Sequence, residues 1–143
     1  MVIDCADPDR MTRFWATALH YDIAPPPDGY PTWRAFYLAI GVDEAELGDG
    51  DAADRVVDPA GVGPRIWFQQ VPEAKAGKNR LHLDLMVSDG RSAPRERRRE
   101  QVEAEVARLV EAGASRAWDH DDPDVDHYAV TMRDPEGNEF CVV

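Results

Sequence analysis

The first half of the chain contains one helical pattern and several strand-like segments. Between residues 7 and 19 apolar side chains recur every three or four positions after Asp7-Pro8, a typical helix start, so an amphipathic helix is predicted there. Short apolar segments bounded by Gly, Pro or Asp predict strands at residues 2–5, 21–24, 32–40 and 65–71. The acidic, glycine-containing stretch 41–54 has no apolar period and is expected to form an exposed loop.

The second half repeats this order of elements. Residues 81–87 alternate between apolar and polar types, which predicts a half-buried strand with His82 and Asp84 on its polar face. The apolar face of this strand is predicted to consist of Leu81, Leu83, Leu85 and Val87. A helix is predicted over residues 94–112, with Gly113 as its stop. Three further strands are expected at residues 115–119, 128–132 and 139–143.

Two features recur about 80 residues apart and indicate an internal duplication. An aspartate precedes each predicted helix, at Asp7 and Asp89, and an Asp-Pro-x-Gly turn precedes each closing strand, at Asp58 and Asp134. We therefore predict an α+β fold of two repeated βαβββ modules that form a half-open, mixed β-sheet barrel around a central cavity, with helices outside. The modules are expected to cover residues 1–71 and 80–143 of a single domain, 1–143, with a connector at residues 72–79.

Composition and charge narrow the classes of protein. The chain has 143 residues, of which 43% are hydrophobic, enough for a packed core, and its net charge is −12. Because such a charge repels phosphate backbones, nucleic acid is not an expected partner. The apolar runs fall far short of the roughly 18 residues that span a bilayer, so we expect no membrane partner and a cytoplasmic location. Cys5 and Cys141 have no CxxC spacing, so a disulfide framework is not predicted.

Several segments together resemble a known superfamily. They are the opening Asp4-Cys5-Ala6-Asp7-Pro8 with Phe14-Trp15, residues 58–73, the strand Asn79-Arg80-Leu81-His82-Leu83-Asp84-Leu85 and the ending 134–141. In these segments and in its duplication the chain resembles the glyoxalase-like branch of the vicinal oxygen chelate superfamily, which also contains bleomycin-resistance proteins and extradiol dioxygenases. The resemblance covers nearly the whole chain apart from residues 41–54. It implies a fold more specifically than a reaction, because one fold hosts many activities.

The resemblance implies a divalent metal, the one cofactor suggested here, held by one residue from each of four strands and open to adjacent oxygens of a substrate. His82 stands at a position where the family has a histidine ligand. Gln69 and Glu139 are further candidate ligands, whereas Cys141 falls where the family has a glutamate. The ligand of the opening strand has no counterpart, so the chain departs from the family pattern at two of the four positions.

His82 and Asp84 are the strongest catalytic candidates from the residues themselves. They lie two apart on one strand face, where a carboxylate can bias an imidazole and form a general acid–base pair. Two ionisable groups among leucines are costly to bury without a purpose. The alternative is that both line a wet cavity or form hydrogen bonds with a neighbouring sheet.

A second group of residues is predicted to contact the ligand. Trp33 and Trp67 are candidates for aromatic walls of the cavity, although core packing is the alternative for each of them. The other predicted ligand-binding residues are Gln69, Glu139, Cys141 and, at the mouth of the pocket, His127. The acidic stretch 119–127 lacks the glycine and the final glutamate of a calcium loop and is expected to be a solvated hairpin.

The expected function is that of a small-molecule enzyme of the lyase or isomerase kind. His82 and Asp84 are its acid–base pair, Gln69 is a polar anchor, and a metal assists the reaction. One alternative is a non-catalytic drug- or metabolite-binding protein of the bleomycin-resistance type, which needs aromatic walls and acidic groups but no ligand quartet. Another is a regulatory or assembly module that binds no small molecule. A homodimer is expected because a small sheet exposes its edges.

Overall fold

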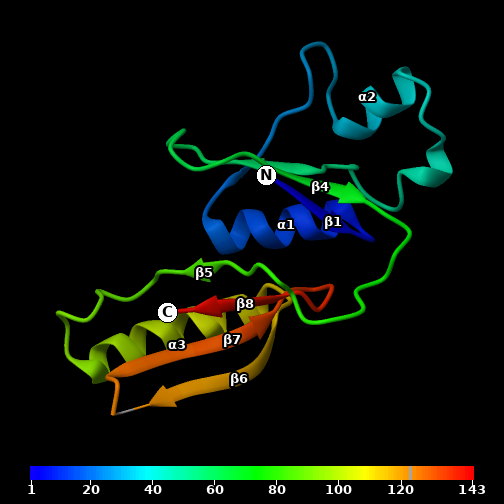
Figure 1. Cartoon of the computed structure of the whole chain (residues 1–143). Helices are drawn as coiled ribbons and strands as arrows, with labels where there is room; N and C mark the ends of the chain where they lie inside the picture. Colours follow the sequence, from blue (N-terminus) through cyan, green and yellow to red (C-terminus); the bar gives the residue numbers. More distant parts are fainter. Residues whose placement is uncertain (123) are drawn as a thin grey trace. The chain divides into compact units, whose positions relative to one another are not determined.

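The computed structural model describes residues 1–122 and 124–143, which form two units: unit 1, Met1–Ala74, and unit 2, Lys75–Val143 (Figure 1). Unit 1 contains β1 (Val2–Cys5), α1 (Pro8–Leu19), β2 (Asp22–Ile23), α2 (Trp33–Ala39), the 3₁₀ turn Glu44–Glu46, β3 (Arg55–Val57) and β4 (Ile66–Gln70). Unit 2 contains β5 (Asp84–Leu85), α3 (Arg95–Glu111), β6 (Ser115–Asp122), β7 (His127–Arg133) and β8 (Glu139–Val142). No helix in the described part of the chain is long and apolar enough to cross a membrane.

The two sheets have the same topology. Their strand orders are β1-β4-β3-β2 and β5-β8-β7-β6. In each sheet the first strand pairs parallel with the last, and all other pairs are antiparallel. The predicted α+β fold of two βαβββ modules is therefore confirmed, with two mixed, open sheets. The homodimer expected from exposed sheet edges stays a prediction.

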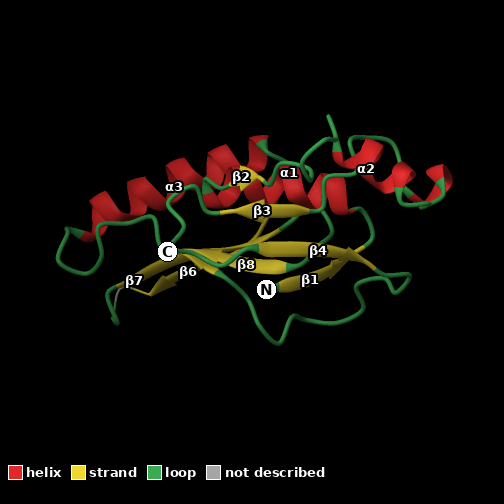
Figure 2. Cartoon of the chain, turned by 90° about the horizontal axis from the view of Figure 1, so that it is seen from above, coloured by secondary structure: helices red, strands yellow, loops and turns green. Residues whose placement is uncertain are grey.

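Each unit buries one face of its sheet under a helix (Figure 2). In unit 1, Asp7 caps α1 by accepting a hydrogen bond from the Arg10 backbone N–H at 3.1 Å, and Pro8 occupies the first turn, as predicted. The core of unit 1 includes Met11, Phe14, Trp15, Ala18, Val56, Ile66 and Phe68. The core of unit 2 includes Val102, Val106, Leu109, Val130, Met132, Phe140 and Val142.

The predicted Asp-Pro-x-Gly turns are present in both units. The Asp58 carboxylate accepts hydrogen bonds from the backbone N–H groups of Ala60, Val62 and Gly63. In the same way Asp134, which is buried, accepts from the backbone of Glu136 and Asn138. The glycines of the two turns, Gly61 and Gly137, have φ angles of 68° and 87°, a conformation that side chains disfavour. The turns thus direct β4 and β8 by the same local chemistry.

Two predictions in unit 1 are wrong. The segment 32–40 contains helix α2 (Trp33–Ala39) rather than a strand, because the Thr32 hydroxyl caps the helix by accepting a hydrogen bond from the Ala35 backbone N–H at 3.0 Å. The helical spacing lets Phe36 and Tyr37 pack around the buried Trp33. The stretch 41–54 is also not uniformly exposed, because its last three residues, 52–54, are buried.

Two predictions in unit 2 are also corrected. The strand expected at residues 81–87 is shorter: β5 covers only Asp84–Leu85, although backbone hydrogen bonds to residues 141–143 extend from Leu83 to Val87, and Leu81 is 89% exposed. The helix predicted over residues 94–112 is confirmed as α3, and the Asp89 carboxylate before it accepts a hydrogen bond from Arg97. The stretch 119–127, expected to be a solvated loop of a hairpin, is only partly a loop, because residues 119–122 belong to β6 and pair with residues 127–130 of β7; Pro123 lies outside the described residues.

Candidate functional site

A row of side chains crosses all four strands of the sheet in unit 2. Asp84 is in register with Cys141, Cys141 with Thr131, and Thr131 with Trp118. Residues in register point to the same face of a sheet, and their neighbours along each strand point to the other. Those neighbours include Leu85, Val130, Met132 and Val142, which are buried, and α3 contacts the strands β7 and β8 that carry the last three. The row therefore lies on the face of the sheet that α3 does not cover.

This face carries a cleft of about 370 Å³. It is lined by Lys78, His82, Asp84, Trp118, His120, His127, Ala129, Thr131, Glu139, Cys141 and Val143. Five of these residues, His82, Asp84, His127, Glu139 and Cys141, are predicted site residues. The structure brings them together although they come from three separate stretches of the sequence.

His82, Asp84 and Cys141 form the tightest group in the cleft. The Nε2 atom of His82 lies 3.4 Å from Oδ1 of Asp84, and one donor atom from each of the three residues lies within 4.8 Å of the others. The side chains of His82 and Asp84 are 43% and 50% exposed, so a ligand can reach them.

The donor set of this group is suited to a divalent ion. One imidazole nitrogen, one carboxylate oxygen and one thiolate sulfur match the ligands of zinc better than those of magnesium or manganese, which prefer oxygen. Three protein ligands are also the number that leaves a coordination position open for a substrate. The residues present therefore fit a metal, with Cys141 and Asp84 joining the predicted ligand His82.

A short hydrogen-bonded chain holds Cys141 from the other side. The Thr131 hydroxyl lies 3.4 Å from the Cys141 sulfur and 2.8 Å from Nε2 of His120. Thr131 is only 3% exposed, so its hydroxyl depends on these partners. Sequence reasoning missed both Thr131 and His120. A polar residue in the middle of the apolar segment 128–132 was the available signal.

Glu139 lines the cleft but is held by other partners. Its carboxylate accepts a hydrogen bond from the Asn79 backbone N–H at 3.0 Å and lies 3.1 Å from the ammonium group of Lys75. These interactions, with the backbone hydrogen bond as the larger cause, lower the pKa of Glu139 to about 2. The carboxylate anchors the segment that leads into β5, and it does not belong to the His82, Asp84 and Cys141 group.

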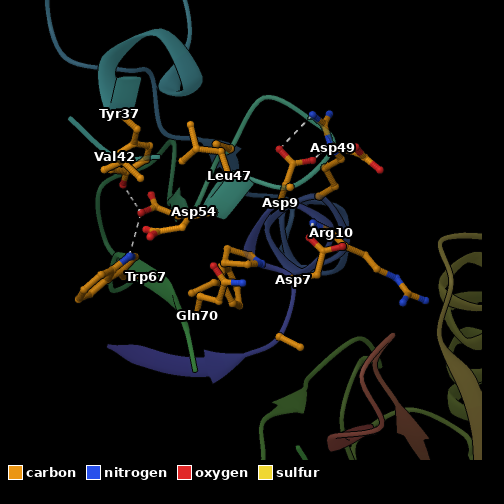
Figure 3. Close-up of a pocket in the computed structure, with 17 residues that line it drawn as sticks. Asp7, Asp9, Arg10, Tyr37, Val42, Leu47, Asp49, Asp54, Trp67 and Gln70 are labelled. Carbon is orange, nitrogen blue, oxygen red and sulfur yellow. Dashed lines mark hydrogen bonds and ion pairs between the residues drawn. The ribbon is translucent and has the colours of Figure 1, made fainter. Parts of the chain in front are cut away.

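Unit 1 contains a larger cleft, of about 710 Å³, with a different chemistry (Figure 3). Asp54, which is buried, accepts hydrogen bonds from the Tyr37 hydroxyl at 2.5 Å, the Trp67 indole at 2.9 Å and the Arg55 guanidinium at 2.6 and 2.8 Å. Burial and then the Asp54 hydrogen bond raise the pKa of Tyr37 to about 12. Asp9, at the other side of the cleft, is paired with Arg13. These carboxylates are engaged in structural contacts, so the reactive group of unit 2 is the stronger candidate site.

The remaining predicted residues lie in unit 1. Trp67 lines the larger cleft, and the residue is 39% exposed. Trp33 is 5% exposed and donates its indole N–H to the Ala24 carbonyl at 2.7 Å, so it is a core residue rather than a wall. Gln69 is in register with Asp4 on β1 and lines neither of the two clefts described here; its neighbour Gln70 lines the cleft of unit 1.

The sequence matches the family profile described as a glyoxalase-like domain over residues 1–143, its whole length. The chain belongs to the glyoxalase-like domain family. No curated protein sequence matches this glyoxalase-like chain. The match to the family profile confirms the resemblance that the individual motifs indicated.

Solved structures with the same fold include enzymes and resistance proteins. A glyoxalase/bleomycin resistance protein/dioxygenase family enzyme from Burkholderia phytofirmans is 16% identical, with a TM-score of 0.58 over 99% of this chain and 93% of the other. A variant of the fosfomycin resistance protein of Listeria monocytogenes, solved with Mn(II) and 1S,2S-dihydroxypropylphosphonic acid, is 10% identical, with a TM-score of 0.58 over 99% and 83%. Lactoylglutathione lyase from Agrobacterium tumefaciens is 14% identical, with a TM-score of 0.52 over 99% and 88%. At these identities the likeness establishes the fold alone.

The ion pair of Glu139 gives a prediction for this glyoxalase-like domain. Because the pKa of Glu139 falls from 4.5 to about 2 on folding, its carboxylate stabilises the protein above about pH 4.5, and this contribution is lost as the pH falls through about 2. Glu139→Gln should therefore lower the free energy of unfolding at pH 7, and the difference from the wild type should shrink as the pH falls from about 5 to about 2. Urea unfolding at several pH values measures this difference.

Glu73→Gln is the matched control, because Glu73 is exposed and forms no ion pair among the described residues. It removes the same charge from the chain and should leave the unfolding free energy nearly unchanged. Equal stability of the two variants at every pH would contradict the anchoring role of Glu139.

Proposed function

We propose that the protein is a small-molecule enzyme of the lyase or isomerase kind, with the cleft of unit 2 as its active site. The observation that carries this proposal is the convergence of His82, Asp84 and Cys141, whose donor atoms lie within 4.8 Å of one another. Imidazole, carboxylate and thiol groups are side chains that transfer protons or hold catalytic metals. Their place in an open cleft leaves room for a substrate beside them.

The same three residues are proposed to hold a divalent ion. When bound there, the ion supplies Lewis acidity toward an oxygen atom of the substrate. The presence of Mn(II) in the structure of the Listeria fosfomycin resistance protein supports metal binding by this fold. The thiol of Cys141 favours zinc or another ion of similar softness in this chain.

Proton transfer is assigned to Asp84, with His82 beside it. Oδ1 of Asp84 lies beside His82, at 3.4 Å from Nε2, while Oδ2 of the same half-exposed carboxylate can accept a proton from a substrate carbon next to a carbonyl group. A proton held at Oδ2 can return to a different carbon in an isomerisation, or it can pass to the leaving group of a lyase reaction, whose bond to the neighbouring carbon breaks as the carbon–carbon double bond forms. Thr131 fixes the Cys141 sulfur during these steps through its 3.4 Å contact.

The metal content of the purified protein tests the proposed ligands. Protein prepared without chelators and incubated with zinc should carry about one ion per chain by plasma mass spectrometry, because three protein donors form a complete catalytic set. His82→Ala and Cys141→Ser should each lose most of this ion. His20→Asn is the control, because it removes an imidazole from unit 1 at a residue whose φ of 55° asparagine tolerates. An ion retained in both site variants, or absent from the wild type, would contradict the proposed centre.

Hydrogen exchange on test compounds separates an enzyme from a binding protein. Small 2-oxo and 2-hydroxy acids are incubated with the protein in deuterated water. Proton NMR then follows the loss of the signal of the hydrogen on the carbon next to a carbonyl group, which is C3 in a 2-oxo acid and C2 in a 2-hydroxy acid. The wild type should accelerate this loss for at least one compound, and Asp84→Asn should reduce the rate about 100-fold, the usual contribution of a general base. Asp28→Asn, in an exposed turn of unit 1, should retain the wild-type rate.

The binding-protein alternative makes the opposite prediction. Compounds would raise the melting temperature of the protein, as any ligand of the folded state does, but neither deuterium incorporation nor a product would appear. That result would reject the proposed enzyme function while leaving the cleft as a binding site.

A further inference from the structure

The lining of the cleft of unit 2 contains one lysine and two carboxylates. Both carboxylates of the lining already have partners: Asp84 lies beside His82, and Glu139 is held by Lys75 and the Asn79 backbone. Lys78, by contrast, forms no ion pair with any described residue, although the chain carries an excess of acidic side chains. Lys78 is therefore a cation of this cleft that is available to a ligand.

A second cation lies close to the same place. The Lys78 ammonium is 5.9 Å, and the Arg133 guanidinium carbon 6.0 Å, from the centroid of the Trp118 ring. Arg133 likewise forms no ion pair within the described part of unit 2. Six other arginines of this unit do have carboxylate partners, namely Arg95, Arg97, Arg98, Arg99, Arg108 and Arg116. Two cations that form no ion pair among the described residues therefore lie beside one exposed indole.

The rest of the lining determines what else the ligand must be. Trp118, which is 38% exposed, offers a flat apolar surface, and Ala129 and Val143 add small apolar contacts. A volume of about 370 Å³ is near the lower end for small-molecule pockets, which suits a compact metabolite. The reactive group of His82, Asp84 and Cys141 lies in the same cleft.

We propose that this cleft selects small anionic substrates: the carboxylate or phosphoryl group of the substrate docks against Lys78, beside Trp118, and its reacting carbon lies next to His82, Asp84 and Cys141. Arg133 strengthens the positive potential at the docking position. This inference rests on the proposed function, since it names the substrate class of the same active site. Lysine is well suited to the role because its ammonium is a compact point charge that binds carboxylates and phosphates in several geometries.

Binding of simple probes tests the inference without knowledge of the natural substrate. Inorganic phosphate and lactate are titrated into the full-length protein at low ionic strength, with propane-1,2-diol as the uncharged counterpart of lactate, and dissociation constants are taken from NMR chemical-shift changes. At least one anion should bind saturably, whereas the diol should not. The tighter of the two anions assigns the phosphoryl or the carboxylate class.

Variants locate the binding site. Lys78→Ala should weaken anion binding about fivefold, the effect of one partly exposed charge pair, and Lys78→Arg should restore it. Arg91→Ala is the matched control, because Arg91 is also exposed and without an ion pair among the described residues but does not line the cleft. Equal affinities of the Lys78→Ala and Arg91→Ala variants would overturn the inference, and so would a diol that binds as tightly as lactate or a wild type that binds neither anion.

The failure of this inference can be distinguished from failure of the proposed function. Lys78 is not one of the proposed metal ligands, so Lys78→Ala should keep the metal content of the wild type. A protein that loses its metal in His82→Ala but binds anions independently of Lys78 has the proposed centre and a different substrate class. A protein that binds anions through Lys78 without any metal or hydrogen exchange has the docking site but not the proposed enzyme function.

Discussion

Asp84 and Cys141 are in register because β5 runs parallel to β8, and the account of unit 2 depends on that pairing. It is short, covering only Asp84 and Leu85, but the burial of Leu85 and Val142 determines which face each neighbour occupies. A shift of one residue would bury the Asp84 carboxylate and expose Leu85, at a large cost in free energy. The hydrophobic contacts of one face therefore position the reactive groups of the other.

The duplicated fold has this chemistry in only one of its copies. When the two closing strands are aligned on their buried residues, with Ile66 and Phe68 matching Phe140 and Val142, Trp67 takes the place of Cys141. Trp67 is in register with Val2 on one side and Arg55 on the other, so the corresponding row of unit 1 has no thiol and no carboxylate. Its indole donates instead to Asp54. The two units thus share their topology, but only unit 2 carries reactive groups such as Asp84 and Cys141 in this row. This difference accounts for the departure of the chain from the family pattern of one metal ligand on each of four strands.

Patterns with a strong local cause could be predicted from the sequence. Helices α1 and α3, the two turns at Asp58 and Asp134, and the shared face of His82 and Asp84 all follow from spacing and turn chemistry. The segment 32–40 could not be predicted, because a single cap by Thr32 and aromatic packing around Trp33 decide between helix and strand. The contribution of Thr131 and His120 also depends on register between β6, β7 and β8, which only long-range pairing determines. Local signals therefore found most of the elements together with His82, Asp84 and Cys141, and tertiary contacts added Thr131 and His120.

The most direct test of the central claim is X-ray absorption spectroscopy of the zinc-loaded protein, since it reports the atoms bound to the ion. The account predicts a first shell that contains one sulfur at about 2.3 Å together with nitrogen and oxygen atoms at about 2.0 to 2.2 Å. The sulfur contribution should disappear in Cys141→Ser and remain in Cys5→Ser, because Cys5 is buried in unit 1. A first shell of nitrogen and oxygen alone in the wild type would contradict the proposed centre of His82, Asp84 and Cys141.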